Sequence, residues 1–344
     1  MKRKGLQYLF MIIALVPLLV LNISCVGVPG GGSARTGDAV EVVWDEGITT
    51  GVTRITNDGN FKNWARVSPD GTKLLYTEAT KAGNWAIMYL RDANNPAKTP
   101  LVNEVAYSPS WYEDSNRFIY ISFEAGTGRL VRSSISGGGR TYISRSAIGA
   151  QGDDAPAIRD GLIVFSAFSG QRWEIVTINE NGTETTFLGE GRSPSWHPTE
   201  DKILFIRNPD NNSRAGGAGG DIFEMDMNSG QVTQIYSDPN FWCYTPSYSP
   251  DGRRILFVKG TAVRTRGTAT TTSALGTTTR TAVSTENLRT HIFVMNADGT
   301  NVSPVSSGNA SVMSPSWGTN GEVFCLVGIE RKAYEIYKLR IRGE

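Results

Sequence analysis

A short segment similar to Pro-Ser-Trp-Ser-Pro-Asp-Gly occurs six times in this chain, and this repeat constrains the fold more than any other feature. An aromatic or apolar residue before each turn marks the copies, and successive markers are 44, 47, 38, 52 and 69 residues apart. Spacings of about 40–50 residues are typical of β-propeller blades, and the longest interval contains an insertion. The markers are Val67, Trp111, Ile158, Trp196, Tyr248 and Trp317.

Each copy is followed by runs of residues typical of β-strands. The first run is rich in β-branched and aromatic residues, as in Lys73–Thr77, and two further runs follow, separated by turn signals such as Asn-Gly or Asp-Gly. Together with the strand that carries the marker, this makes four antiparallel strands in each repeat. We therefore predict an all-β fold, a six-bladed β-propeller with four-stranded antiparallel blades, and no stretch has a helical period.

The two ends of the repeat array are complementary. The sixth copy has no outer strand after Ile341, whereas Gly51–Asn57 has the outer-strand pattern with no inner strands before it. Pairing Val52–Thr56 with the last blade would close the ring through an N-terminal strand and remove two exposed sheet edges. The predicted propeller domain therefore spans residues 49–344.

The N-terminus has the pattern of an export signal. Basic residues 2–4 precede an apolar run from Leu9 to Leu21, and Ser24-Cys25 follows it. We predict a lipoprotein-type signal peptide over residues 1–24, a lipid on Cys25 and a Gly/Ser/Pro-rich tether over residues 25–48. A plainly cleaved secretory signal and an uncleaved membrane anchor are the alternatives, because Asn22 departs from the usual lipobox.

Two segments interrupt the repeat. Residues 208–220 are rich in Gly and Asn, and residues 260–289 are rich in Thr and Ser. Both follow the first strand after a turn, so we expect them to project from the same rim of the propeller. Their low apolar content predicts flexible insertions, either as plain surface loops or as an arm that folds over a partner.

Charge and cysteine content exclude several classes of function. Without residues 2–4 the chain has 31 basic and 33 acidic residues, a balance that gives no electrostatic reason to expect nucleic acid as a partner. Two histidines and no Cys-x-x-Cys motif give no zinc site, and we expect no cofactor. Cys243 and Cys325 are either a disulfide or two buried thiols.

The repeat carries a family resemblance. The SPSW and SPDG turns, the strand Ile292–Gly299 (IFVMNADG) and the third strands resemble the WD40-like repeat of the TolB β-propeller family, over residues 50–342. The resemblance implies a six-bladed propeller and a bacterial envelope protein. TolB has an α/β domain before its propeller, which we do not expect here, and the chain lacks the Gly-x-Ser-x-Gly motif of propeller peptidases.

A binding site is expected where loops enter the innermost strands of a propeller and form a funnel. Aromatic and arginine side chains among polar groups are typical of interaction hot spots. One alternative is that the aromatic side chains pack between blades. A separate alternative is that Glu104, Asp153 and Asp154 form a calcium site. The candidate funnel residues are Lys62, Glu104, Asp153, Asp154, Glu190, Arg192, Trp242 and Tyr244.

These features predict a non-catalytic, membrane-anchored lipoprotein of the bacterial cell envelope that faces the periplasm or the exterior. Its partners would be an envelope protein or peptide at the propeller and the lipid bilayer at the anchor. We predict that it is not an enzyme, because no acid, base and nucleophile converge in the funnel. The alternatives are a carbohydrate-binding or enzymatic propeller acting on glycan or peptide through the central funnel, and a structural scaffold.

Overall fold

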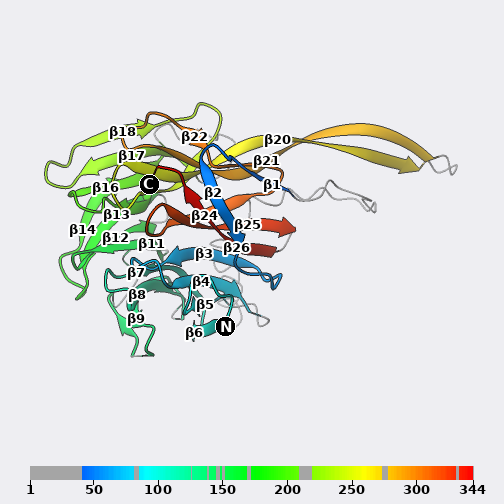
Figure 1. Ribbon diagram of the computed structural model, residues 1–344. Coiled ribbons are helices and arrows are strands. Elements are labelled where there is room, and N and C mark those ends of the chain that lie inside the picture. The colour runs from blue at the N-terminus through cyan, green and yellow to red at the C-terminus, as the bar shows by residue number, and fades with distance from the viewer. Residues whose placement is uncertain are drawn as a thin grey trace, which may run out of the picture.

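The protein is a ring of six β-sheets (Figure 1). The computed structural model describes residues 41–80, 85–124, 126–137, 139–144, 148, 152–168, 172–208, 219–272, 278–330 and 333–343. Within these ranges all regular elements are strands, and each blade is a four-stranded antiparallel sheet. The predicted six-bladed β-propeller is confirmed.

The blades follow one another in chain order. Blade 1 comprises β3 (Lys62–Val67), β4 (Leu74–Ala79), β5 (Trp85–Leu90) and β6 (Lys98–Val102), and blade 2 comprises β7 (Ala106–Trp111), β8 (Arg117–Ser122), β9 (Arg129–Ser134) and β10 (Thr141–Tyr142). Blade 3 comprises β11 (Gly152–Arg159), β12 (Leu162–Phe168), β13 (Trp173–Asn179) and β14 (Thr186–Glu190), and blade 4 comprises β15 (Arg192–Trp196), β16 (Lys202–Arg207), β17 (Asp221–Asp226) and β18 (Val232–Tyr236). Blade 5 comprises β19 (Cys243–Tyr248), β20 (Arg254–Thr272), β21 (Thr278–Asn296) and β22 (Ser303–Pro304), and blade 6 comprises β24 (Val312–Trp317), β25 (Glu322–Glu330), β26 (Ala333–Ile341) and β2 (Thr49–Arg54).

Blade 6 combines strands from both ends of the chain, as the sequence predicts. The N-terminal strand β2 pairs antiparallel with β26, with Thr50 opposite Arg340 and Arg54 opposite Tyr337. The backbone pairing continues past β2, because the Ile55 N–H donates to the Ile336 carbonyl at 2.8 Å. The closing strand is thus confirmed, and it covers the edge that β26 would otherwise expose.

A short strand precedes the closing strand. Strand β1 (Val42–Trp44) pairs antiparallel with β23 (Ser306–Gly308) in a two-stranded sheet beside blades 5 and 6. The range 25–48 that the sequence assigns to a tether therefore includes three residues with sheet structure. The signal peptide and Cys25 lie outside the described residues.

Six apolar layers hold the ring together, one between each pair of neighbouring blades. In blade 2, Phe118 and Tyr120 pack toward blade 1, whereas Ile119 and Ile121 pack toward blade 3. Alternate residues of a strand point to opposite faces. Because both faces of each central strand are buried, these strands have continuous apolar runs in the sequence, as Arg117–Ser122 shows.

The Thr-rich insertion continues two strands of blade 5. Strands β20 and β21 pair without interruption from Arg254 opposite Asn296 to Thr272 opposite Thr278, and they extend as a hairpin away from the ring (Figure 1). Low apolar content did not prevent regular pairing, because a hairpin satisfies backbone hydrogen bonds between its own strands and β-branched Thr favours strands. Most of the other insertion, residues 209–218, lies outside the described part of the chain.

The part of the chain that the structure describes contains no helix with the length and apolar character that a membrane span requires.

Candidate functional site: the central channel

The six innermost strands surround the axis of the propeller, and each has a β-bulge at the same position. In blade 2, for example, the pairing of β7 with β8 shifts between Tyr107 and Ser110. A residue at each bulge has a φ angle between 44° and 53°, which is costly for residues other than glycine. These residues are Trp64, Ser108, Ala155, Ser193, Thr245 and Ser314. Bulges redirect side chains. Because the strained backbone occurs at the same bulge in all six blades, it belongs to the feature that these strands share, the channel wall.

The bulged segments enclose a cavity of about 350 Å³. In five blades the strained residue is followed by a buried proline and then by a small residue that lines the cavity. The small residues are Ser110, Ala157, Ser195, Ser247 and Ser316. The wall therefore combines hydroxyl groups with proline rings. The volume of the cavity is within the range of small-ligand sites.

Blade 1 departs from this pattern through Arg66, the only charged side chain among the described residues that line the cavity. Its guanidinium donates to the Ala65 carbonyl at 2.9 Å and to the Ser314 hydroxyl of blade 6 at 3.1 Å. The sequence interpretation did not select Arg66. Aligning the six repeats would have found it, because the other five have Ser or Ala at this position.

The aromatic markers pack between blades. The Trp111 indole N–H donates to the Arg66 carbonyl of the preceding blade at 2.9 Å, and that of Trp317 donates to the Ser247 carbonyl at 3.4 Å. The marker positions thus connect neighbouring inner strands, and all six also line the cavity.

Three predicted funnel residues lie at the entry to blades 4 and 5. Trp242 is 1% exposed, so the structure buries the aromatic side chain that was expected to face a partner. A Cβ on Gly219 would lie 2.3 Å from the Trp242 Cβ, so a glycine is needed beside this ring. Tyr244 is half-buried, and desolvation by burial raises its pKa. Arg192 is half-buried, with its guanidinium 5.0 Å from the centre of the Trp173 ring.

The two predicted carboxylates whose side chains are described, Glu104 and Glu190, have different surroundings. Glu104 forms an ion pair with Arg140 at 2.6 Å. Glu190 is exposed on the outermost strand of blade 3, although Arg192, two residues later, begins the innermost strand of blade 4. Asp153 and Asp154 lie on the inner strand β11, and their side chains are outside the description.

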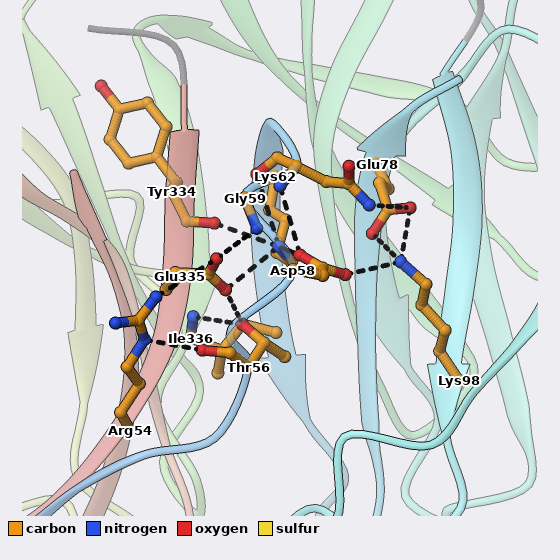
Figure 2. A network of polar contacts seen from close by, with 11 residues as sticks. Arg54, Thr56, Asp58, Gly59, Lys62, Glu78, Lys98, Tyr334, Glu335 and Ile336 are labelled. Carbon is orange, nitrogen blue, oxygen red and sulfur yellow. Dashed lines mark hydrogen bonds and ion pairs between the residues drawn. The ribbon is translucent and has the colours of Figure 1, made fainter. Parts of the chain in front are cut away.

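Lys62 belongs to a different structure, a buried polar network where the ring closes (Figure 2). The Lys62 side chain is fully buried, and its ammonium group pairs with Glu335 at 3.2 Å and with Asp58. It also donates to the Tyr334 carbonyl at 3.3 Å. The Lys62 side chain is therefore enclosed between blades 6 and 1 and is not exposed at the funnel.

Glu335 is the centre of this network. Its carboxylate accepts a hydrogen bond from the Gly59 N–H at 2.7 Å and another from the Thr56 hydroxyl, which in turn accepts from the Ile336 N–H at 2.9 Å. Arg54 lies 3.5 Å from the same carboxylate. Strand β26 is thus connected to the loop that leaves the closing strand.

Through Lys98 the network extends to β6, the outermost strand of blade 1. Its ammonium group lies 2.7 Å from both Asp58 and Glu78. We call the seven residues Arg54, Thr56, Asp58, Lys62, Glu78, Lys98 and Glu335 the closing junction. It contains three cationic and three anionic side chains, so the charges that it buries are balanced.

Neither thiols nor metal ligands form a further site in the described ranges. Cys243 and Cys325 are both buried and form no disulfide, so the structure has the second of the two predicted alternatives, buried thiols. Burial raises the pKa of Cys325. No group of three or more His, Cys, Asp or Glu side chains within the described ranges is arranged to hold a metal ion.

Comparison with known proteins finds similar structures only. No family model and no curated protein sequence matches the chain. A protein assigned as TolB from Agrobacterium tumefaciens has a TM-score of 0.57 at 15% identity, with 86% of this chain and 98% of that chain covered. TolB from Acinetobacter baumannii has a TM-score of 0.53 at 13% identity, with 80% and 66% covered. These similarities support a TolB-like propeller fold.

The comparison overturns one prediction. An oligogalacturonate lyase from Vibrio parahaemolyticus has a TM-score of 0.55 at 12% identity, with 88% of this chain and 98% of that chain covered. An enzyme is therefore as similar in fold as the TolB proteins are. The prediction that the chain is not an enzyme is therefore wrong. It does not follow from this architecture, because one propeller fold supports both binding and catalysis.

Proposed function

We propose that this chain is a propeller of the bacterial cell envelope, attached to a membrane through a lipid on Cys25, that binds a protein or peptide partner at its central channel. The observation that carries the proposal is the cavity of about 350 Å³ lined by six copies of one bulged segment. A cavity of this size takes a short extended segment or a single chain end, not a folded domain.

The character of the wall supports a peptide ligand. Hydroxyl side chains both donate and accept hydrogen bonds, which suits the amide groups of a peptide, and the proline rings offer apolar contact. In five of the six segments a proline, whose φ angle is restricted, directly follows the strained residue. A wall that is already ordered loses little conformational entropy when a ligand binds.

We place the binding site in the channel and not in the loops around it. Trp242 and Lys62, two of the predicted funnel residues, are buried by neighbouring blades. Substituting either would disturb the fold, so a loss of binding in those variants would not locate the site. The channel position Ser110 is a better probe, because it lines the cavity and is only half-buried.

Cross-linking in intact cells tests the proposal. A photo-reactive residue at Ser110 should give a cross-linked protein or peptide, whereas the same residue at the exposed position Thr186 on β14 should not give that product. Ser110→Trp, which fills part of the channel, should reduce the yield of a cross-link formed from Ser247 by tenfold or more, with an unchanged melting temperature. Equal products from Ser110 and Thr186 would refute a partner at the channel.

A further inference from the structure

The hairpin formed by β20 and β21 extends beyond its blade. Strand β19 pairs with β20 only as far as Lys259, and β22 pairs with β21 only at Phe293 and Val294. From Thr261 to Thr272 and from Thr278 to Arg289 the two strands pair with each other. We call these two segments the arm. At about 3.4 Å for each of twelve residue pairs, the arm extends about 40 Å.

The arm and the rest of the folded protein have opposite charge. The arm contains four arginines and one glutamate, a net charge of +3, in a segment that is otherwise mostly Thr, Ser and Ala. Residues 41–260 and 290–344 contain 26 basic and 31 acidic residues, a net charge of −5. The positive charge is therefore concentrated on the part of the molecule that lies farthest from the ring.

The strand register places three of the arginines on one face of the arm. Arg264 is opposite Glu286, Arg266 is opposite Ser284, and Thr270 is opposite Arg280. Residues two apart in a strand, and residues directly opposite each other in a pair, share a face. Positions 264, 266 and 280 thus belong to the same face, and Arg289, opposite Thr261, belongs to the other.

The base of the arm lies beside the point where the described chain begins. Arg289 donates to the Asn309 carbonyl at 2.7 Å. The Asn309 N–H in turn donates to the Glu41 carbonyl at 3.0 Å. Residue 41 is sixteen positions after Cys25. A chain of that length reaches at most about 55 Å, so a lipid on Cys25 would keep the bilayer within reach of the arm.

We propose that the arm binds the anionic lipid surface of the bilayer that holds the protein, an inference that rests on the proposed attachment at Cys25. An anionic bilayer attracts nearby basic residues and repels the body of the propeller, whose net charge is negative. The two effects together would orient the protein with its arm toward the headgroups. A lipid and a basic surface also form the pair of signals that stable membrane attachment uses.

Fluorescence quenching on vesicles tests the inference. The mature protein is purified from cells and inserted into vesicles of phosphatidylcholine, with or without phosphatidylglycerol, that carry a headgroup quencher. A fluorophore on Ser284→Cys reports on the arm, and the same fluorophore on Thr186→Cys reports on the exposed outer strand of blade 3. We expect the arm probe to be quenched severalfold more on anionic than on neutral vesicles, and the control probe to be quenched equally on both.

Two triple variants identify the residues responsible. Arg264→Ser with Arg266→Ser and Arg280→Ser should abolish the difference between the vesicles. Arg172→Ser with Arg253→Ser and Arg340→Ser, three arginines whose side chains are exposed elsewhere, should retain it. Equal quenching of the arm probe on both vesicles, or a difference that survives the arm variant, would overturn the inference.

The experiment distinguishes a protein that carries no lipid on Cys25 from a protein whose arm does not bind anionic lipid. A protein that does not insert into neutral vesicles lacks the lipid, and the arm is then tested by sedimentation with anionic vesicles. Each basic residue near an anionic surface increases binding about fivefold. The arm variant should therefore weaken sedimentation by about a hundredfold, and a protein that does not sediment with anionic vesicles would contradict the proposal.

Discussion

The closing junction and the junction between blades 4 and 5 share a loop sequence but are stabilised differently. The loop reads Asp58-Gly59-Asn60-Phe61 in the first and Asp238-Pro239-Asn240-Phe241 in the second. In both, the aspartate accepts a hydrogen bond from the asparagine N–H, at 3.2 Å and 2.9 Å. The same local turn therefore leads into blade 1 and into blade 5.

The residue after the loop differs. At the closing junction it is Lys62, buried against Glu335, whereas at the other junction it is the buried Trp242. Blade 4 is formed by one continuous segment, but blade 6 must recruit its outer strand from the opposite end of the chain. A buried ion pair tolerates few alternative partners, whereas an apolar ring packs in many ways. The junction that joins the two ends of the chain thus has a fully buried ion pair, whereas the ion pair of the other junction, Lys259 with Asp238, is partly exposed.

Removing the closing strand should have the largest effect. Deletion of residues 49–57 exposes an edge of blade 6, removes Arg54 and Thr56 from the closing junction, and removes the buried Ile55 from the apolar layer between blades 6 and 1. We expect loss of most of the unfolding free energy, which for a single domain is on the order of 5–15 kcal/mol. Thermal unfolding of the truncated protein measures this. An unchanged melting temperature would mean that the ring does not depend on its closure.

Breaking the buried pair should have the next largest effect. Glu335→Ala leaves Lys62 buried without its carboxylate partner on β26, which should cost about 3–5 kcal/mol in urea unfolding. The double change Lys62→Met with Glu335→Met should recover most of this loss, because it removes both charges. Glu190→Ala on an exposed outer strand is the matched control, with an expected change below about 0.5 kcal/mol. A Glu335→Ala variant as stable as the control would remove the distinction between the two junctions.

The loop aspartates should show the smallest effect, and it should depend on pH. Burial alone would raise the pKa of Asp58, but hydrogen bonds from Lys62 and Lys98 lower it below its ordinary value. The pKa of Asp238 is also lowered, against the effect of burial, by Lys259. A lowered pKa in the folded state stabilises the protein above the ordinary pKa of about 3.9, and this contribution is lost as the pH falls through the folded-state value.

Asp58→Asn should therefore destabilise the protein by about 1 kcal/mol at pH 7, and the difference from the unsubstituted protein should shrink below about pH 4. Asp238→Asn should behave in the same way with a smaller amplitude, because one lysine faces Asp238 and two face Asp58. Unfolding measured against pH in both variants checks this. A deficit of equal size at every pH would show that the charge of the aspartate is not what stabilises the loop.

Most of the fold was predictable because its information is local and repeated. The turn and the apolar run that follows it identify each blade, and alternation of two residues identifies the strands. The closing strand could be assigned from an imbalance, since an outer strand was present at one end and absent at the other. The regular backbone of the arm was not predicted, because apolar content does not detect strands that satisfy each other's hydrogen bonds.

The burial of the candidate site residues was predicted less well than the fold. Lys62 and Trp242 are both next to a loop that enters an inner strand, which in the sequence indicates exposure near the funnel. Their burial depends on Glu335 and on Gly219, which are 273 and 23 positions away along the chain. Arg66 carried a sequence signal, a charge at a position otherwise occupied by Ser or Ala, but the significance of that position becomes visible only when the six bulges surround one cavity.

The sequence by itself determined the number of blades, the strands in each and the way the ring closes, because these follow from a repeated local pattern and from the need to pair every sheet edge. Tertiary structure alone decided which side chains face the channel and which are buried between blades. The physical reason is that a side chain at a loop becomes exposed or buried according to what packs against it. In a ring, that neighbour belongs to another blade.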